Sequence, residues 1–351
     1  MRNAFAKVIT KLASKNKKII LLSGDIGNRL FDDYKKKYSK RFYNCGVAES
    51  LMTGLAAGLA SSGSIAITYT IATFNTLRCL EQIKLDVAYQ KLPVIIVGTG
   101  SGLSYSSLGA THHSLDDYSI LKCIPNLSIF SPSDSIELEA VLEKVIKDKK
   151  PSYIRIGKKG EKTFFKKKPI IKDNKVNILK RGSKYLILCV GSTISIGHEM
   201  LKLFRNQKEV ELTSVCSLKP FDERYIISEF RKKKKILLLE EQIENVGFSS
   251  TIKNFLYTKD FSIQNGFRIY SCMKGLNPYK KDKPTQEITN NSQYTGDYIC
   301  SDGKETTCLP YGQENTDGQY VTCPKQTDIL YPSDKMKTVD NCMSWCNNNP
   351  L

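Results

Sequence analysis

The chain has 351 residues, 40% of them hydrophobic, which is enough for two domains with ordinary buried cores. No apolar run of about 18 residues occurs, and the first residues lack the continuous apolar stretch of a secretory signal, so we expect a cytoplasmic protein without a membrane span. The formal net charge of +18 comes from scattered lysine runs without interleaved aromatic residues, which argues against nucleic-acid binding. Such a surface would instead attract anionic substrates such as sugar phosphates.

Short apolar runs alternate with helical segments over the first part of the chain. After an amphipathic helix at 1–18, strands are predicted at 19–22, 65–69, 93–97, 127–130 and 153–156, and helices at 50–60, 77–89, 116–121 and 136–145. This alternation predicts an α/β domain, residues 1–160, with a parallel sheet covered on both faces. Sheets of this kind bind ligands in the loops that follow the carboxyl ends of their strands.

A lysine-rich segment with little apolar periodicity, 161–175, is the predicted linker to a second α/β domain at 176–273. Within that domain, strands are predicted at 185–190, 211–215, 236–239 and 267–271, and helices at 197–204, 223–231 and 249–256. The pattern is the same alternation as in the first domain, so a second parallel sheet is expected.

The last part of the chain, 274–351, is polar, lacks apolar periodicity and holds five of the 11 cysteines. We expect an irregular or disordered extension. A disulfide-stapled appendage would require an oxidising compartment, and a zinc site lacks a CxxC pair and a nearby histidine. No function is inferred for this segment.

Three motifs fall in loops of the first domain, where ligands are expected. They are Gly46-Val47-Ala48-Glu49 before a small-residue helix, Thr73-Phe74 followed by Arg78, and a glycine-bounded loop that carries His112-His113. In order and spacing they closely resemble the pyrimidine-binding domain of transketolases and 1-deoxyxylulose-5-phosphate synthases. Residues 176–273 resemble the transketolase C-terminal domain, with Glu240-Glu241-Gln242 after a buried strand. The resemblance covers roughly residues 1–273.

The resemblance implies that Glu49 is catalytic and binds thiamine diphosphate. A glutamate at this position of the family bonds N1′ of the aminopyrimidine ring and promotes removal of the thiazolium C2 proton, after which the cofactor carries the difficult chemistry. It also implies that Phe74 stacks on the ring and that Arg78 belongs to the cofactor site. Without the motifs, Glu49 reads as a helix N-terminal carboxylate, and Phe74 as a core aromatic residue.

His112 matches the family histidine that contacts substrate hydroxyls and moves protons, a role that suits an imidazole. His113 is expected to bind substrate beside it, although a satisfied surface pair is the alternative. The family commonly has an aspartate where this chain has Leu108, so specificity for ordinary pentose phosphates is not implied. Arg155, Lys158 and Lys159 are expected to bind the substrate phosphate, or else to form a basic linker end.

The family binds the diphosphate and Mg²⁺ through a Gly-Asp-Gly motif and a later Asn, which this chain lacks in the required context. Gly24-Asp25 lies in the first strand-loop of the pyrimidine-binding domain. The resemblance therefore implies a second chain, a diphosphate-binding transketolase subunit, that shares the thiamine diphosphate, holds the Mg²⁺ and assembles into a dimer of heterodimers. No metal ligand is expected in this chain.

The function implied is that of a transketolase-like transferase subunit, which moves a two-carbon ketol unit between sugars. Two alternatives remain. One is a subunit related to 1-deoxyxylulose-5-phosphate synthase or to a ketoacid dehydrogenase beta subunit. The other is a non-catalytic scaffold or regulatory homologue.

Overall fold

The computed structural model describes residues 1–271 except 28, 159, 244 and 260–266. The chain divides into a main unit, residues 1–105 with 112–276, and a second unit, residues 106–111 with 277–351. Of the second unit only residues 106–111 are described, and they include a short 3₁₀ turn at Ser106–Leu108. The predicted irregular extension, 274–351, lies outside the described residues.

A seven-stranded sheet forms the first part of the main unit, in the order β10-β5-β6-β4-β3-β1-β2. Its strands are β1 (Ile19–Ser23), β2 (Phe42–Asn44), β3 (Ile65–Ile71), β4 (Val94–Thr99), β5 (Ser128–Phe130), β6 (Ser152–Ile156) and β10 (Ser217–Lys219). All pairs are parallel except the edge pair β10–β5. Every residue of β3, β4 and β6 is buried, as expected for central strands of a parallel sheet with both faces covered.

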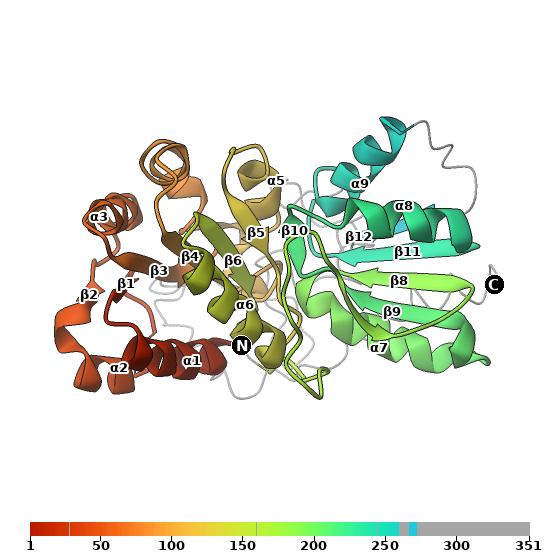
Figure 1. Cartoon of the computed structure of the whole chain (residues 1–351), viewed down its shortest axis with the longest axis horizontal. Helices are drawn as coiled ribbons and strands as arrows, with labels where there is room; N and C mark the ends of the chain where they lie inside the picture. The colour runs from red at the N-terminus through yellow and green to blue at the C-terminus, as the bar shows by residue number, and fades with distance from the viewer. Residues whose placement is uncertain (28, 159, 244, 260–266, 272–351) are drawn as a thin grey trace, which may run out of the picture. The chain divides into compact units, whose positions relative to one another are not determined.

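Helices cover both faces of this sheet (Figure 1). They are α1 (Arg2–Lys15), α2 (Asp32–Lys37) and α6 (Ser135–Asp148) on one face, and α3 (Glu49–Ser61), the helical segment Leu77–Tyr89 and α5 (Asp117–Leu121) on the other. The segment Leu77–Tyr89 consists of a 3₁₀ turn (Leu77–Cys79), α4 (Leu80–Gln82) and a π-helical stretch (Ile83–Tyr89). Irregular helices of this kind often occur at functional sites.

A five-stranded sheet follows, in the order β12-β11-β8-β9-β7. Its strands are β7 (Asn177–Lys180), β8 (Tyr185–Cys189), β9 (Val210–Ser214), β11 (Lys235–Glu240) and β12 (Phe267–Ser271), and its helices are α7 (Ile194–Leu203), α8 (Glu223–Lys232) and α9 (Phe248–Tyr257). Only β7 runs antiparallel. One apolar core runs from the α3 face of the first sheet into the α8–α9 face of the second.

The predicted α/β class with parallel sheets is confirmed. Each predicted helix and strand has an observed counterpart, with ends displaced by a few residues. Apart from 3₁₀ turns, the elements without a predicted counterpart are short: α2, β2, β7 and β10. Each of these strands lies at a sheet edge and is only three or four residues long, which is too short for a periodic pattern.

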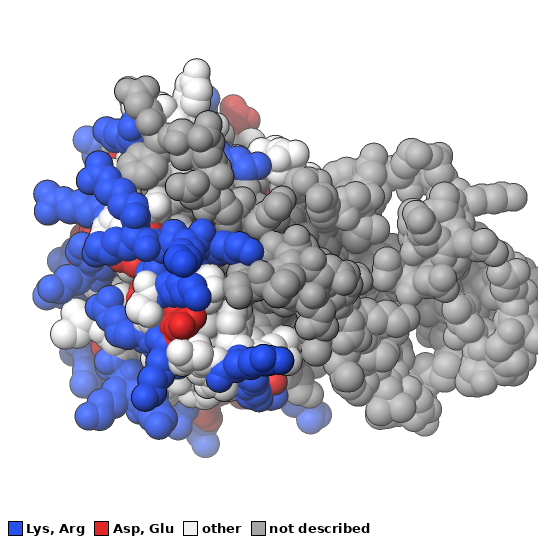
Figure 2. Space-filling model, turned by 90° about the vertical axis from the view of Figure 1, so that its right-hand side faces the viewer, with Lys and Arg blue, Asp and Glu red and all other residues white. Residues whose placement is uncertain are grey.

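Basic side chains gather at the amino ends of the second sheet's parallel strands (Figure 2). Lys184, Lys208 and Lys234 precede β8, β9 and β11, and backbone hydrogen bonds join these loops. The helices α7 and α8 end at the same edge of the sheet. Lysine and arginine in their last turns interact favourably with the negative ends of the helix dipoles. In the described part of the chain, no helix has the length and apolar content needed to cross a bilayer.

The buried carboxylate of Glu240 provides a test of how the second sheet holds its helix. The backbone N–H of Phe248 donates to Glu240 Oε2 at 2.7 Å, and Ser249 N–H donates at 3.3 Å, so this carboxylate caps α9. We expect Glu240→Ala to lower the free energy of unfolding by about 1–3 kcal/mol, because two buried donors lose their acceptor. Urea denaturation measures this. Glu223→Ala, on the exposed first turn of α8, is the control, and equal losses in both variants would refute the capping role.

Candidate active site

Glu49 begins α3, directly after the turn that follows β2. Its side chain is 2% exposed, and Oε2 accepts a hydrogen bond from Arg78 Nη1 at 3.0 Å. Gly24, directly after β1, lies against the aliphatic part of the Glu49 side chain. A Cβ on Gly24 would stand 3.0 Å from Thr70 Cβ in β3 and 3.5 Å from Glu49 Cγ in α3. Glycine therefore permits the close approach of both side chains to the backbone after β1. The helix that carries Glu49 is thus packed tightly onto the sheet.

Phe74 and Arg78 follow the carboxyl end of β3. The guanidinium carbon of Arg78 lies 4.1 Å from the centre of the Phe74 ring, a cation–π distance. Arg78 therefore contacts the Glu49 carboxylate and the Phe74 ring at once. The hydroxyl of Ser50 donates to the Arg78 carbonyl at 2.6 Å and fastens α3 to this turn.

His112 lies next to Phe74, with 4.9 Å between ring centres and an edge-on angle of 65°. The ring centre of Tyr105 lies 6.0 Å from that of His112, and Lys158 Nζ lies 4.4 Å from the Tyr105 ring centre. Gly100 makes room for Tyr105: a Cβ there would meet the ring at 2.1 Å, and its φ of +81° also favours glycine.

These contacts form a continuous row of side chains across the loops that follow β2, β3, β4 and β6: Glu49, Arg78, Phe74, His112, Tyr105 and Lys158. Five of them are candidates predicted from the sequence, and parallel pairing brings them together because all four strands end at one edge. Tyr105 was not among the predicted site residues, although it lies in the same glycine-rich loop.

The electrostatic environment of His112 is positive. Burial lowers the pKa of His112, and the charges of His113, Arg78 and Lys158 lower it further. A histidine of this kind is neutral at neutral pH and has a nitrogen able to accept a proton. Such a group is suited to proton transfer with a substrate hydroxyl.

Two further predicted site residues, His113 and Lys159, are not part of the row as described. His113 follows His112 in the loop and is buried. Lys159 lies outside the described residues.

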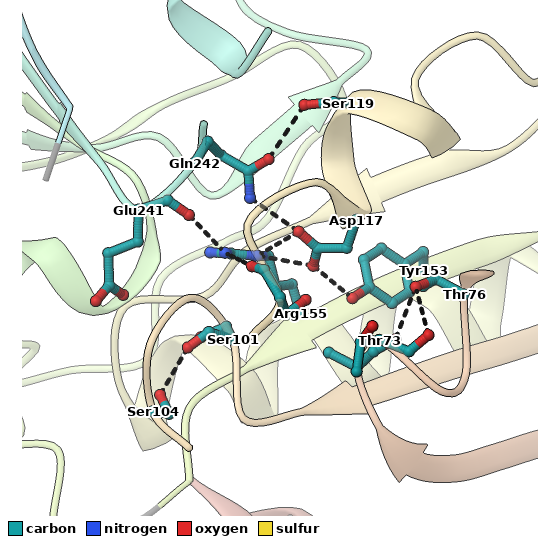
Figure 3. Close-up of polar contacts among 12 residues, drawn as sticks. Thr73, Thr76, Ser101, Ser104, Asp117, Ser119, Tyr153, Arg155, Glu241 and Gln242 are labelled. Atoms are coloured by element: carbon teal, nitrogen blue, oxygen red, sulfur yellow. Dashed lines mark hydrogen bonds and ion pairs between the residues drawn. The ribbon is translucent and has the colours of Figure 1, made fainter. Parts of the chain in front are cut away.

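Arg155 requires a correction, because it lies within β6 rather than after it and is 2% exposed. Its Nε donates to both carboxylate oxygens of Asp117, at 3.1 and 2.8 Å, and its Nη2 donates to the Glu241 carbonyl at 2.9 Å (Figure 3). Nη2 also donates to the Ser114 carbonyl at 2.9 Å. A guanidinium engaged in this way in the interior does not face a substrate phosphate. We therefore describe Arg155 as a positioning residue.

Asp117 is the centre of this buried network, which joins the two sheets. Besides Arg155, it accepts hydrogen bonds from Tyr153 Oη at 2.7 Å and from Gln242 Nε2 at 2.8 Å (Figure 3). Through the Ser114 carbonyl, the network holds the end of the loop that carries His112 and His113. No role was predicted for Asp117 from the sequence. Its role depends on a buried basic partner that is distant in sequence, and no local motif indicates such a partner.

The described residues hold no cluster of three or more His, Cys, Asp or Glu side chains arranged to hold a metal ion.

Two family models match the chain. The model described as "Transketolase, pyrimidine binding domain" matches residues 1–160, and "Transketolase, C-terminal domain" matches residues 174–282.

Among individual proteins, a subunit of the apulose-4-phosphate transketolase of Actinobacillus succinogenes is 32% identical over 218 residues, which are 62% of this chain and 70% of that protein. The 1-deoxy-D-xylulose-5-phosphate synthase of Pelotomaculum thermopropionicum is 28% identical over 72% of this chain, which spans only 40% of the synthase. A solved split-gene transketolase, described as an inactive beta4 tetramer, is similar with a TM-score of 0.69 and 26% identity over 77% of this chain and 88% of that chain.

The Arg155–Asp117 pair is tested by Arg155→Met, which leaves a fully buried carboxylate without its cation. We expect a loss of about 3–5 kcal/mol in the free energy of unfolding, measured by urea denaturation. Arg224→Met, on the exposed face of α8, should leave the midpoint unchanged. A stable Arg155→Met protein with weakened substrate binding would restore the substrate-contact role.

The pKa of His112 is tested by removing one nearby charge. We expect Lys158→Met to raise this pKa toward its ordinary value, read from the ring proton shifts in NMR and compared with the remote variant Lys208→Met. Because the pKa in the folded state lies below that in the unfolded state, His112 contributes stability that is present above the unfolded pKa and is lost as pH falls through the folded pKa. An unchanged titration in Lys158→Met would contradict the electrostatic contact.

Proposed function

The chain belongs to the transketolase family, and from this premise we propose that it is the pyrimidine-binding subunit of a thiamine diphosphate-dependent enzyme that transfers a two-carbon ketol unit between sugars. The family resemblance found in the sequence is thereby confirmed. The observation that carries the proposal is that one side chain, Arg78, contacts both the buried carboxylate of Glu49 and the Phe74 ring, with His112 next to that ring.

The residues at the edge of the sheet fit an aminopyrimidine ring. A carboxyl group donates a hydrogen bond to a ring nitrogen when it is protonated and accepts one from a ring N–H when it is ionised, and an aromatic face supplies stacking. In the proposal, Glu49 bonds the ring and Phe74 stacks on it. When bound, thiamine diphosphate supplies carbanion stabilisation to a ketose carbonyl carbon.

Substrate contacts are proposed on the other side of Phe74. His112, neutral because burial and neighbouring charges lower its pKa, accepts and returns a hydroxyl proton. The ammonium of Lys158, at the end of the row of side chains, binds a phosphate or another anionic group. His113 and Lys159 are proposed to assist substrate binding from the same two loops.

A partner chain is supported by the surface around Glu49. Large apolar side chains are exposed there: Val47 (72%), Leu51 (68%), Leu55, Leu77, Leu85 and Tyr89. Exposed apolar patches commonly mark protein interfaces. Two of the relatives are named as one subunit of a transketolase, and a solved relative made of beta chains is described as inactive. We propose that a diphosphate-binding subunit docks here, holds the Mg²⁺ and completes a cytoplasmic dimer of heterodimers.

A second candidate is a 1-deoxyxylulose-5-phosphate synthase-like or ketoacid dehydrogenase-like reaction, favoured by the similarity to synthases over the same residues. The donor separates the candidates. A transketolase reaction uses hydroxypyruvate as donor, whereas the alternative reactions use pyruvate or another ketoacid. Turnover with neither donor, in a complex that binds the cofactor, would favour a scaffold or regulatory role.

Glu49→Gln tests the catalytic assignment. The amide keeps the size of the side chain but cannot share a proton with the ring, so we expect a loss of about 10²–10⁴-fold in turnover. The assay mixes the chain with its diphosphate-binding subunit, thiamine diphosphate, Mg²⁺ and hydroxypyruvate, and size-exclusion chromatography checks assembly. Glu223→Gln, exposed on α8 and outside the proposed docking surface, should behave as wild type. Full turnover in Glu49→Gln would refute the assignment.

A further inference from the structure

Arg78 touches both groups that the proposed function assigns to the cofactor's aminopyrimidine ring. Its Nη1 donates to Glu49 Oε2 at 3.0 Å, and its guanidinium carbon lies 4.1 Å from the centre of the Phe74 ring. Within the described residues, no other side chain is shown to contact both Glu49 and Phe74.

A guanidinium and an aminopyrimidine have the same two recognition features. Both are flat, delocalised nitrogen systems that hydrogen-bond a carboxyl group in their plane and stack on an aromatic face. The guanidinium does so as a donor, whereas the ring nitrogen shares a proton with the carboxyl group. The carboxylate of Glu49 and the ring of Phe74 offer these complementary surfaces. One planar group that uses both surfaces leaves little room for a second.

We propose that Arg78 is an internal placeholder for the aminopyrimidine ring. The Arg78 side chain must leave Glu49 and Phe74 before the ring can bind to them. The inference rests on the proposed function and corrects the expectation that Arg78 itself binds the cofactor. In this account Arg78 opposes cofactor entry, and Glu49 exchanges one planar nitrogen partner for another.

The surroundings of Arg78 allow such an exchange. Its side chain is 47% exposed, whereas that of Glu49 is 2% exposed, so the arginine can turn toward solvent while the carboxylate stays in place. The backbone of Arg78 is held separately, by the Ser50 hydroxyl on its carbonyl. Movement of the side chain therefore does not require the helical segment Leu77–Tyr89 to move.

The exchange affects both groups together. Arg78 holds the Glu49 carboxylate and the Phe74 ring face with one side chain. Its departure therefore frees the carboxyl group and the aromatic face at the same time.

The experiment measures binding rather than turnover. The chain is assembled with its diphosphate-binding subunit, and the Kd of thiamine diphosphate with Mg²⁺ is measured by calorimetry for wild type, Arg78→Met and Arg78→Lys. Arg78→Met keeps the length of the side chain but loses the charge and the planar donors. Arg224→Met, remote on α8, is the matched control, and sedimentation checks that every variant assembles.

We expect Arg78→Met to bind the cofactor about tenfold more tightly, which corresponds to one half-exposed ion pair and one cation–π contact that no longer compete. Arg78→Lys should fall between it and wild type, because an ammonium keeps the charge but not the planar fork. Binding by Arg78→Met that is equal to or weaker than wild type would overturn the placeholder and leave the proposed function intact. Lack of binding in all variants would instead reject the proposed function, and this inference with it.

Discussion

The candidate site depends on how the protein accommodates a carboxylate at the buried start of an apolar helix. A buried charge without a partner costs several kcal/mol or is neutralised, and Glu49 is 2% exposed. In the described part of the chain, its ion pair is with Arg78. The loop after β3 therefore has to place a donor next to the loop after β2, and the neighbouring positions of these strands around β1 in the sheet allow this.

The second structural requirement is a rigid base for the loop that carries His112. The Asp117–Arg155 pair, with Tyr153 and Gln242, ties the carboxyl ends of the first sheet to the loop after β11 of the second. Because Arg155 also bonds the Ser114 carbonyl, the same interaction that joins the sheets fixes the backbone two residues beyond His112. The second sheet thus supports the site without contributing a side chain to the row.

Much of this arrangement was predictable from the sequence, and what was missed has identifiable causes. Apolar runs indicated the central strands, and the predicted strand ends before Phe74 and His112 indicated one common edge of the sheet. Glu49 was assigned to the site by its motif, because the strand before it, β2, was not predicted. The Asp117–Arg155 pair was missed because its members are 38 positions apart and become partners only when α5 packs on β6. The burial of Arg155 and its pairing with Asp117 were not anticipated for a related reason: a basic residue near a strand end resembles a phosphate ligand in sequence, whatever its burial. The placement of Arg78 over Phe74 depends on side-chain conformation, which spacing alone does not specify.

The central claim is that the Glu49 carboxyl acts on a thiamine ring held jointly with a second chain. The most direct measurement is the rate at which the C2 proton of thiamine diphosphate exchanges with deuterated solvent, followed by quenched-flow NMR in the reconstituted two-chain complex. This rate requires no sugar donor or acceptor. The account predicts rapid exchange with wild type, slowed by about 10²-fold or more in Glu49→Gln at unchanged cofactor occupancy, and no acceleration by either chain alone. Equal exchange rates in wild type and Glu49→Gln, or acceleration by this chain alone, would contradict it.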